Sequence, residues 1–234
     1  MASDYLEARQ TTRMNPDPEA LRQLAAHYDT LAFKHGNTPA AVQKSSLETQ
    51  EARLKILSDV VLDPAASISD FGCGAGYLLS YLRREKGYSG EYTGYDISHR
   101  LLELARDAYP DATFQKRDIF AEGISSSFDY VLVSGVFNNR INDNWGFICG
   151  ALTTPFKSCK KAMAFNLLSR YVDFTDPGLF YADPAAVFHF CKEHLSPCVT
   201  IRHDYEVKAG TVPFEFTTIV YPSSHHSRTL RQYE

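Results

Sequence analysis

From residue 67 onward, short apolar runs alternate with longer segments whose apolar residues recur at helical spacing. Few folds suit this alternation, because each helix carries the chain back across a sheet and brings the next strand in parallel to the last. Strands are expected at 67–71, 91–95, 113–116, 128–134 and 161–168, and helices at 77–86, 98–109, 143–156 and 183–195. The pattern predicts an α/β fold.

The two ends of this region depart from the alternation. Upstream, one helix is expected to begin at Pro18 after the capping residue Asp17, and a second to run over 46–61. Downstream, 199–205 and 213–221 are both typical of strands and have no helix between them, so the last strand should run antiparallel. We therefore predict a Rossmann-like seven-stranded, mostly parallel sheet with an antiparallel last strand, helices on both faces and an N-terminal helical lid.

Length and composition suit one domain with a sizeable core, since 44% of the 234 residues are hydrophobic. We expect a single domain over 18–222, with its lid at 18–62, between a flexible leader at 1–17 and a flexible tail at 223–234. The chain has neither an apolar run of roughly 18 residues nor a secretory-type start, which favours a cytoplasmic protein with no membrane partner. A net charge of -4 argues against a nucleic-acid partner, and the oligomeric state stays open.

The cysteines and histidines do not predict a disulfide framework or a metal site. The five cysteines stand at irregular spacings, without a C-x-x-C pair. His189, Cys191 and His194 come close in sequence, but positions i and i+5 of a helix diverge. We therefore expect no bound metal.

A glycine-rich segment, DFGCGAG, follows the first strand of the alternating region. Gly72, Gly74 and Gly76 allow a tight turn and a close approach of a ligand, because no Cβ intervenes. Asp70 is a candidate acceptor for a ligand ammonium group, directly or through water. The spacing differs from the dinucleotide pattern G-x-G-x-x-G, whose third glycine is replaced by Tyr77, which argues against a nicotinamide or flavin site.

Acidic residues end the next two strands. Asp96 is placed to accept hydrogen bonds from both hydroxyls of a ribose, and Ile97 to pack against a base. Asp118 is placed to accept from an exocyclic adenine amine. A strand-end acid alone is often only a helix cap, but the three signals come in order at three successive strand ends. Together they predict a nucleoside site at the carboxyl edge of the sheet.

The segments ISDFGCGAGYLLSYL, YTGYDIS and QKRDIF resemble the glycine-rich and acidic motifs of class I S-adenosylmethionine-dependent methyltransferases, and the resemblance covers roughly residues 20–221. It implies S-adenosylmethionine as the cofactor. It also implies that the three glycines border the methionine part of that cofactor, that Asp96 binds the ribose, and that Asp118 and Ile119 border the adenine.

The N-terminal helices carry two further candidates for cofactor binding. The segment around Tyr28 resembles the lid of small-molecule members of this family, in which such a tyrosine lies near the sulfonium. Arg53 is a candidate partner for the cofactor carboxylate, because a guanidinium grips a carboxylate with two hydrogen bonds. A core aromatic at residue 28 and a solvated helix arginine at residue 53 remain the alternatives.

The loop after the fourth strand faces the transferring methyl group in this fold family. The resemblance therefore makes Ser134 a candidate for cofactor binding and Phe137 and Asn138 candidates for substrate binding. The Asn/Asp-Pro-Pro-Tyr motif of many DNA-amine and glutamine methylases does not stand here. Tyr171 and Tyr181 follow the fifth strand, where family members often build a substrate cover, although both also suit core packing.

His203 is the candidate general base. It is expected in the sixth strand, on the same face as Val199 and Ile201, and a histidine titrates near neutral pH. A satisfied core histidine is the alternative. A base is optional for methyl transfer, because proximity and alignment supply much of the catalysis.

These observations predict a methyltransferase that acts on a small-molecule metabolite, at oxygen, nitrogen or carbon, in a natural-product pathway. A protein or RNA methyltransferase is one alternative within enzymes. A non-catalytic S-adenosylmethionine-binding protein, acting as a regulator or as the partner of an active paralogue, is another reading. A third is a repurposed fold that catalyses decarboxylation or cyclisation.

Overall fold

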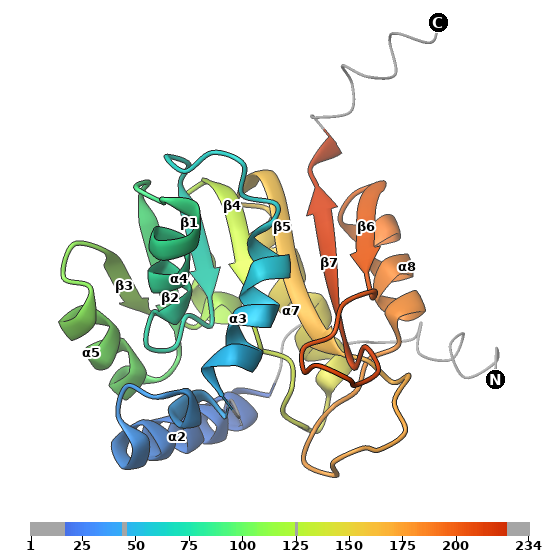
Figure 1. The fold of residues 1–234 in the computed structure, drawn as a ribbon, viewed down its shortest axis with the longest axis horizontal. Helices are drawn as coiled ribbons and strands as arrows, with labels where there is room; N and C mark the ends of the chain where they lie inside the picture. Colours follow the sequence, from blue (N-terminus) through green and yellow to red (C-terminus); the bar gives the residue numbers. More distant parts are fainter. Residues whose placement is uncertain (1–16, 44–45, 125, 224–234) are drawn as a thin grey trace, which may run out of the picture.

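The computed structural model describes residues 17–43, 46–124 and 126–223 (Figure 1). The expected leader and tail lie outside these residues, except at Asp17 and Ser223. Within the described residues, a central sheet is covered by helices on both faces.

The seven expected strands lie in one sheet, in the order β3-β2-β1-β4-β5-β7-β6. They are β1 (Ile68–Phe71), β2 (Tyr92–Asp96), β3 (Thr113–Lys116), β4 (Phe128–Val133), β5 (Cys159–Leu168), β6 (Cys198–Arg202) and β7 (Glu215–Tyr221). Neighbours from β3 to β5 pair in parallel, whereas β7 is antiparallel to both β5 and β6. This confirms the predicted sheet. Its strand order reverses between β1 and β4, which is where open α/β sheets bind ligands.

Polar side chains set the starts of the longer helices. The described helices are α2 (Pro18–His35), η1 (Pro39–Val42), α3 (Leu47–Ser58), α4 (Tyr77–Lys86), α5 (His99–Ala108), α6 (Ile119–Glu122), α7 (Asn144–Phe156) and α8 (Pro184–His194). The side chains of Asp17, Ser46, Ser98, Asp143 and Asp183 each accept a hydrogen bond from a free N–H of the following helix. These bonds satisfy donors that have no partner inside the helix.

Three details differ from the sequence-based expectations. The four-residue helices η1 and α6 were not predicted, because one turn is too short to show helical periodicity. The helix expected over 46–61 ends at Ser58. β6 ends at Arg202, its last residue paired with β7, so His203 follows the strand instead of lying in it.

Alternate residues of the central strands pack on opposite faces of the sheet. Tyr130 and Leu132 belong to the apolar cluster that includes residues of α3, α4 and α5. Val131 and Val133 belong to the cluster that includes residues of α7 and α8. Figure 1 shows α3 and α4 in front of the sheet and α7 behind it. Because both faces are covered, the ends of the strands are left for ligand binding.

The helix α2 lies across the carboxyl edge of the sheet, toward which β1 and β4 point (Figure 1). One carboxylate oxygen of Asp29 accepts from the Ser98 hydroxyl at 2.5 Å and from the Arg100 N–H at 3.1 Å. Ala32 is buried in a small cluster with Leu101 of α5. The lid is therefore held to the start of α5, directly beside the end of β2.

Candidate functional site

Two adjoining cavities lie at the carboxyl edge of the sheet, and Tyr28, Val42 and Gly135 line both of them. Cavity 1 is lined by Leu21, Leu24, Tyr28, Val42, Phe71, Gly72, Gly74, Asp96, Ile97, Leu101, Arg117, Asp118, Ile119, Phe120, Gly135, Val136 and Phe147. Cavity 2 is lined by Tyr28, Val42, Gln43, Arg53, Gly135, Asn138, Asn139, Leu168, Val172, Asp173, Phe174, Leu179, Tyr181, Gly210, Thr211, Val212, Phe214 and Glu215. Their empty space, counted together with the open solvent at their mouths, is about 690 Å³ and about 1470 Å³.

The glycine-rich segment forms one wall of cavity 1. Gly72 and Gly74 line the cavity, with φ angles of 74° and 53° that disfavour residues with a Cβ. A Cβ on Gly72 would stand 2.2 Å from the side chain of Val136. Gly76 does not line either cavity; a Cβ there would meet the rings of Tyr109 and Phe114. A glycine is therefore required at residue 76 by close packing at the start of α4 and not by contact with either cavity.

Asp96 ties the glycine-rich segment to the end of β2. One of its carboxylate oxygens accepts from the Gly74 N–H at 2.9 Å and the other from the Ser98 N–H at 2.8 Å. The side chain is buried yet lines cavity 1. Burial raises the pKa of Asp96, while the backbone N–H bonds act in the opposite direction. A carboxylate oxygen has two lone pairs, so both oxygens keep acceptor capacity for a ligand hydroxyl.

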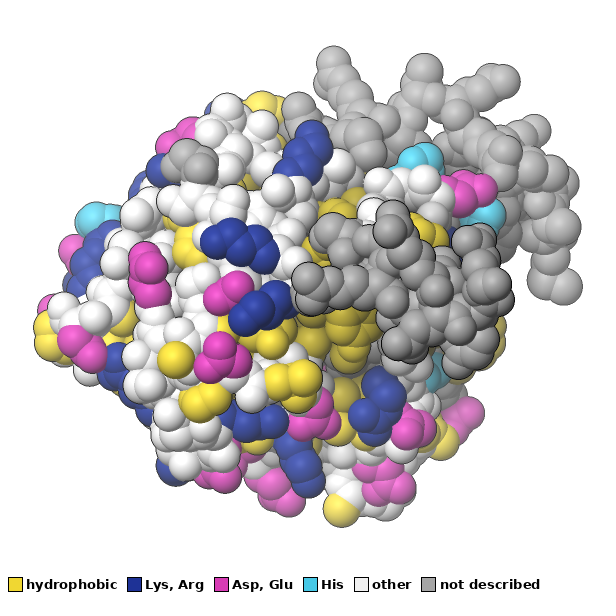
Figure 2. Space-filling view, turned by 90° about the horizontal axis from the view of Figure 1, so that it is seen from above, with side chains coloured by type: hydrophobic (Ala, Val, Ile, Leu, Met, Phe, Trp, Pro, Cys, Tyr) yellow, Lys and Arg dark blue, Asp and Glu magenta, His cyan; other side chains and the backbone are white. Residues whose placement is uncertain are grey.

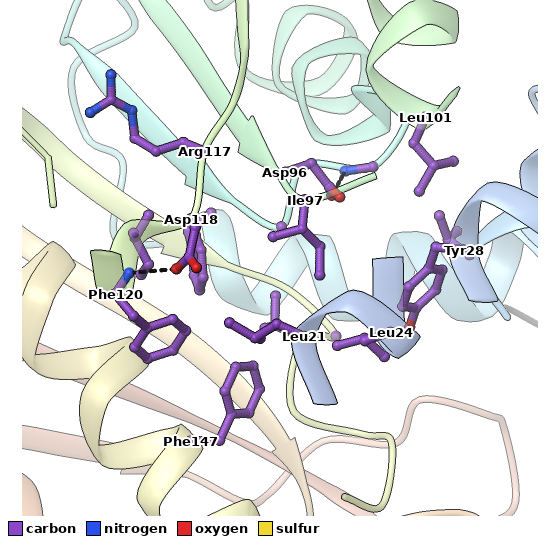
Figure 3. Close-up of a pocket in the computed structure, with 17 residues that line it drawn as sticks. Leu21, Leu24, Tyr28, Asp96, Ile97, Leu101, Arg117, Asp118, Phe120 and Phe147 are labelled. Atoms are coloured by element: carbon purple, nitrogen blue, oxygen red, sulfur yellow. Dashed lines mark hydrogen bonds between the residues drawn. The ribbon is translucent and has the colours of Figure 1, made fainter. Parts of the chain in front are cut away.

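Asp118 lies on the side of cavity 1 away from Tyr28, with Ile97 between them in the view of Figure 3. One oxygen of Asp118 caps α6 by accepting from the N–H groups of Phe120 and Ala121, at 3.0 and 3.3 Å. Ile97 and Ile119 supply apolar surface to the cavity.

Asp70 lies beneath the glycine-rich segment and lines neither cavity. It is 2% exposed, and its carboxylate accepts from the Tyr92 hydroxyl at 2.5 Å. Burial raises the pKa of Asp70 to about 7. The structure therefore does not bring Asp70 to the place where a direct bond to a ligand ammonium was expected.

The lid contributes Tyr28 at the boundary of the two cavities. Its hydroxyl accepts from the Asn139 amide at 2.9 Å. Burial raises the pKa of Tyr28 to about 12, so the phenol stays protonated at neutral pH. Asn139 was not predicted, although it stands directly after the predicted Asn138.

The loop after β4 is placed differently from the expectation. Gly135 and Val136 line cavity 1, whereas Ser134 lines neither cavity. Phe137 is 1% exposed and packs against the rings of Phe147 and Phe165, so its position does not support the expected contact with substrate. The chain turns inward there because an aromatic ring fills the core beneath the loop.

Asn138 and Tyr181 both line cavity 2, as their expected substrate roles require. The Asn138 carbonyl accepts from the Phe180 N–H at 2.9 Å, which holds the loop after β4 to the loop that carries Tyr181. The Tyr181 hydroxyl accepts from the Asp176 N–H at 3.0 Å.

A buried polar network joins cavity 2 to the loop after β4. The Arg53 Nε–H donates to Glu215 at 2.6 Å, and a second donor of Arg53 reaches the Thr49 carbonyl at 3.0 Å. The other Glu215 oxygen accepts from the side-chain amide nitrogen of Asn166 at 3.1 Å. The side-chain amide oxygen of Asn166 accepts in turn from the Gly135 N–H at 2.9 Å. Arg53 lines cavity 2 and not cavity 1, and its charge is balanced by Glu215, so its position does not support the expected bond to a cofactor carboxylate.

Glu215 and Asn166 were missed because no residue near them in sequence marks a site. The available signal is Asn166 inside the apolar run AFNLL of β5, and Glu215 as an acid at the start of the buried strand EFTTIVY of β7. A buried charge is costly unless it is paired, so such residues point to a partner elsewhere.

His203 and Tyr171 lie outside both cavities. The His203 Nε2 lies 2.9 Å from the Pro213 carbonyl oxygen, which can only accept, so Nε2 carries a proton and donates. The His203 ring packs between those of Tyr171 and Phe216. Tyr171 itself is 61% exposed. These positions do not support His203 as a base or Tyr171 as a substrate contact. His203 does not share a strand face with Val199 and Ile201 as predicted, because β6 ends at Arg202.

Among the residues that the structure describes, no cluster of three or more His, Cys, Asp or Glu side chains suits a metal ion. The five cysteines are free, and all except Cys198 are buried. Within the same residues, no helix has the length and apolar character needed to cross a membrane.

Comparison with known proteins identifies the family. A family profile described as "Methyltransferase domain" matches residues 62–164, which span β1 to the first half of β5. The chain is 34% identical over 167 residues to "Putative methyltransferase Rv1506c" of Mycobacterium tuberculosis (strain ATCC 25618 / H37Rv), and this match covers 68% of the chain and 94% of the relative.

Solved structures share the fold at low sequence identity. The DhpI-SAM-HEP complex matches with a TM-score of 0.65 and 14% identity, over 89% of this chain and 100% of that one. The [4+2]-cyclase SpnF matches with a TM-score of 0.63 and 14% identity, over 88% and 98%. With the strand-end glycines and acids in place, and a curated relative matched over nearly its whole length, the chain belongs to the class I S-adenosylmethionine-dependent methyltransferase family.

Proposed function

We propose that cavity 1 holds S-adenosylmethionine and that cavity 2 holds a small-molecule methyl acceptor. The observation that carries this proposal is the shared wall of the two cavities, where Tyr28 and Gly135 line both. Two ligands placed in such adjoining cavities meet at this wall. One protein of similar fold, DhpI, is known in a complex named with SAM, which supports the assignment of this cofactor to cavity 1.

The residues of cavity 1 fit this cofactor. Asp96 offers carboxylate oxygens for the ribose hydroxyls, and Asp118 offers one for the adenine amine. Ile97 and Ile119 provide apolar surface for the base, while Gly72 and Gly74 line the cavity with their backbones, which pack closely against Val136 and Val42. Gly135 would border the methionine part. When bound, the cofactor supplies a methyl group that its sulfonium has already activated.

The protein's own contribution is alignment and the exclusion of water. Leu21, Leu24 and Tyr28 of α2 cover cavity 1, and the bonds of Asp29 hold this lid to α5. Alignment of two reactants contributes up to about 7–11 kcal/mol to such a reaction. Tyr28 keeps its proton at neutral pH, so it acts as a hydrogen-bond donor and not as a base.

A small acceptor suits cavity 2 better than a macromolecule. The cavity is a pocket open to solvent and bordered by the lid, the loop that carries Tyr181 and the segment around Thr211. Its one arginine, Arg53, is neutralised by Glu215. Elsewhere, surface arginines such as Arg83 are paired with acids, and Figure 2 shows Lys and Arg interspersed with Asp and Glu over one face. RNA binding instead needs a concentration of positive charge.

The proposal is tested with cofactor labelled in its methyl group. The protein is incubated with it and with three fractions of one bacterial lysate: small molecules, RNA and protein. We expect label to enter the small-molecule fraction, with S-adenosylhomocysteine formed in equal amount. Label in RNA or protein would contradict the acceptor class.

Two other outcomes identify the competing functions. Tight cofactor binding without any S-adenosylhomocysteine would favour a non-catalytic binder. An altered small molecule that carries no label would favour the repurposed reaction, of which the cyclase named among the fold relatives is an example.

A further inference from the structure

We propose that cavity 2 takes an uncharged acceptor with an apolar or aromatic body, and that the Arg53–Glu215 ion pair sets this preference against anions; the inference rests on the proposed function of cavity 2 as the acceptor site.

The walls of cavity 2 are apolar on several sides. Leu168 comes from the end of β5, Val172 and Leu179 from the loop that follows it, and Phe214 from the residue before β7. The exposed Phe174 and Val212 stand at the rim. These residues come from segments far apart in sequence and converge on one space. An apolar or aromatic molecule entering it removes this surface from water.

Among the described residues that line cavity 2, no cation lacks an acidic partner. Its charged lining residues are Arg53, Glu215 and Asp173. The side chains of Arg53 and Glu215 are only 10% and 1% exposed and lie 2.6 Å apart, so their charges cancel in a poorly solvated place. Asp173 is exposed, where water screens it. An anionic acceptor would therefore bring a second negative charge beside Glu215.

The ion pair is held in place on both sides. Arg53 also donates to the Thr49 carbonyl, and Glu215 also accepts from Asn166, which in turn fixes the Gly135 N–H. Glu215 cannot turn away from an anion without leaving these buried partners unpaired, which is costly. The selection against anions is thus built into cavity 2 alone, in a network that reaches Gly135 of the shared wall through Asn166.

Three further polar residues that line cavity 2 carry no charge. The Tyr28 hydroxyl, Asn139 and Asn138 line cavity 2 beside Gly135. Neutral groups suit a hydroxyl or an uncharged amine on the acceptor, so the atom to be methylated would lie at the polar end, with the apolar body toward Leu168 and Phe214.

The test uses two probes that differ in charge and little in size, 4-hydroxybenzyl alcohol and 4-hydroxybenzoate. Their binding to protein saturated with S-adenosylhomocysteine is measured by ligand-observed NMR titration. We expect the alcohol to bind the natural protein at least about tenfold more tightly than the carboxylate. Equal binding, tighter binding of the carboxylate, or no binding of either probe would overturn the proposal.

A charge variant assigns the preference to the ion pair. Glu215→Gln leaves Arg53 without its counter-charge, so the affinity for 4-hydroxybenzoate should rise by about tenfold while that for the alcohol changes little. The double variant Arg53→Gln/Glu215→Gln removes both charges and leaves no unpaired buried charge, so it should fold even if the single variant does not. Its affinity for 4-hydroxybenzoate should not rise. An unchanged carboxylate affinity in Glu215→Gln, or an equal rise in the double variant, would overturn the role of the pair.

Affinity for S-adenosylhomocysteine, measured by calorimetry on each protein, separates this inference from the proposed function. Natural affinity in all variants, together with the predicted probe preferences, supports both. Natural affinity with the wrong probe preferences overturns the inference alone. No affinity in the natural protein overturns the proposed function of cavity 1.

Discussion

Cavity 1 and cavity 2 share a wall but are built from different kinds of structure. The polar groups of cavity 1 stand at successive strand ends, and backbone N–H groups fix Asp96 and Asp118. Cavity 2 is built from the lid, three loops and the ends of β5 and β7, and side chains such as Asn166 and Glu215 hold it together. Backbone bonds at strand ends preserve a cofactor site, whereas loops can change with the acceptor.

The largest expected effect on cofactor binding comes from adding a side chain at Gly72, where the backbone packs closely against Val136. Gly72→Ala places a Cβ 2.2 Å from Val136 at a φ of 74°, so the segment must move. We expect affinity for S-adenosylhomocysteine to fall by at least about a hundredfold in calorimetry. Gly87→Ala is the matched control, because its φ of 62° is equally unfavourable but no atom lies within 4 Å. Equal affinities in the two variants would remove the close-approach argument.

Asp96→Ala should have the next largest effect. It removes the proposed ribose acceptor and leaves the N–H groups of Gly74 and Ser98 without their partner, each at about 1–3 kcal/mol. We expect affinity for S-adenosylhomocysteine to fall by about a hundredfold. Asp111→Ala is the control, since that carboxylate is paired with Arg83 on the surface. Natural affinity in Asp96→Ala would refute the ribose role.

A pH effect should reveal the buried carboxyl group of Asp70, which lies beneath the glycine-rich segment. Burial raises the pKa of Asp70 to about 7 from its ordinary 3.8, so between these values the folded state holds a proton that the unfolded state releases. The free energy of unfolding should therefore fall as pH rises through that window. Asp70→Asn should flatten this fall in denaturant titrations at several pH values. The raised pKa of Asp96 acts in the same direction, so part of the slope should stay. An equally steep slope in the variant would contradict the assignment to Asp70.

The smallest expected effect concerns the wall between the cavities. Tyr28→Phe removes the bond from Asn139, which is worth about 0.5–1.5 kcal/mol of stability. Affinity for S-adenosylhomocysteine should stay within about threefold, because the apolar ring still covers cavity 1. Tyr181→Phe makes the same chemical change in cavity 2 alone. A large loss of cofactor affinity in Tyr28→Phe would mean that its hydroxyl binds the cofactor directly.

The same contrast explains how much was predictable. The strands, the caps at Asp17 and Ser98 and the placement of Asp96 and Asp118 follow from local patterns, because the end of a parallel strand fixes where its next residue lies. Local sequence patterns therefore predict the polar residues of cavity 1 and the antiparallel direction of β7.

Cavity 2 depends on contacts that no local pattern contains. Arg53 and Glu215 are 162 residues apart, and only the completed sheet brings them together. Phe137 was misplaced because sequence does not tell whether a loop turns toward a cavity or toward the core. His203 was misplaced because β6 ends at Arg202, before the expected end at residue 205.

A crystal structure of the protein with S-adenosylhomocysteine would test the assignment of the two cavities most directly. We expect the ribose hydroxyls on Asp96, the adenine between Ile97 and Ile119 with its amine on Asp118, and the sulfur beside Gly135, facing cavity 2. A ligand bound elsewhere, or one in cavity 1 with its sulfur turned away from cavity 2, would overturn the assignment.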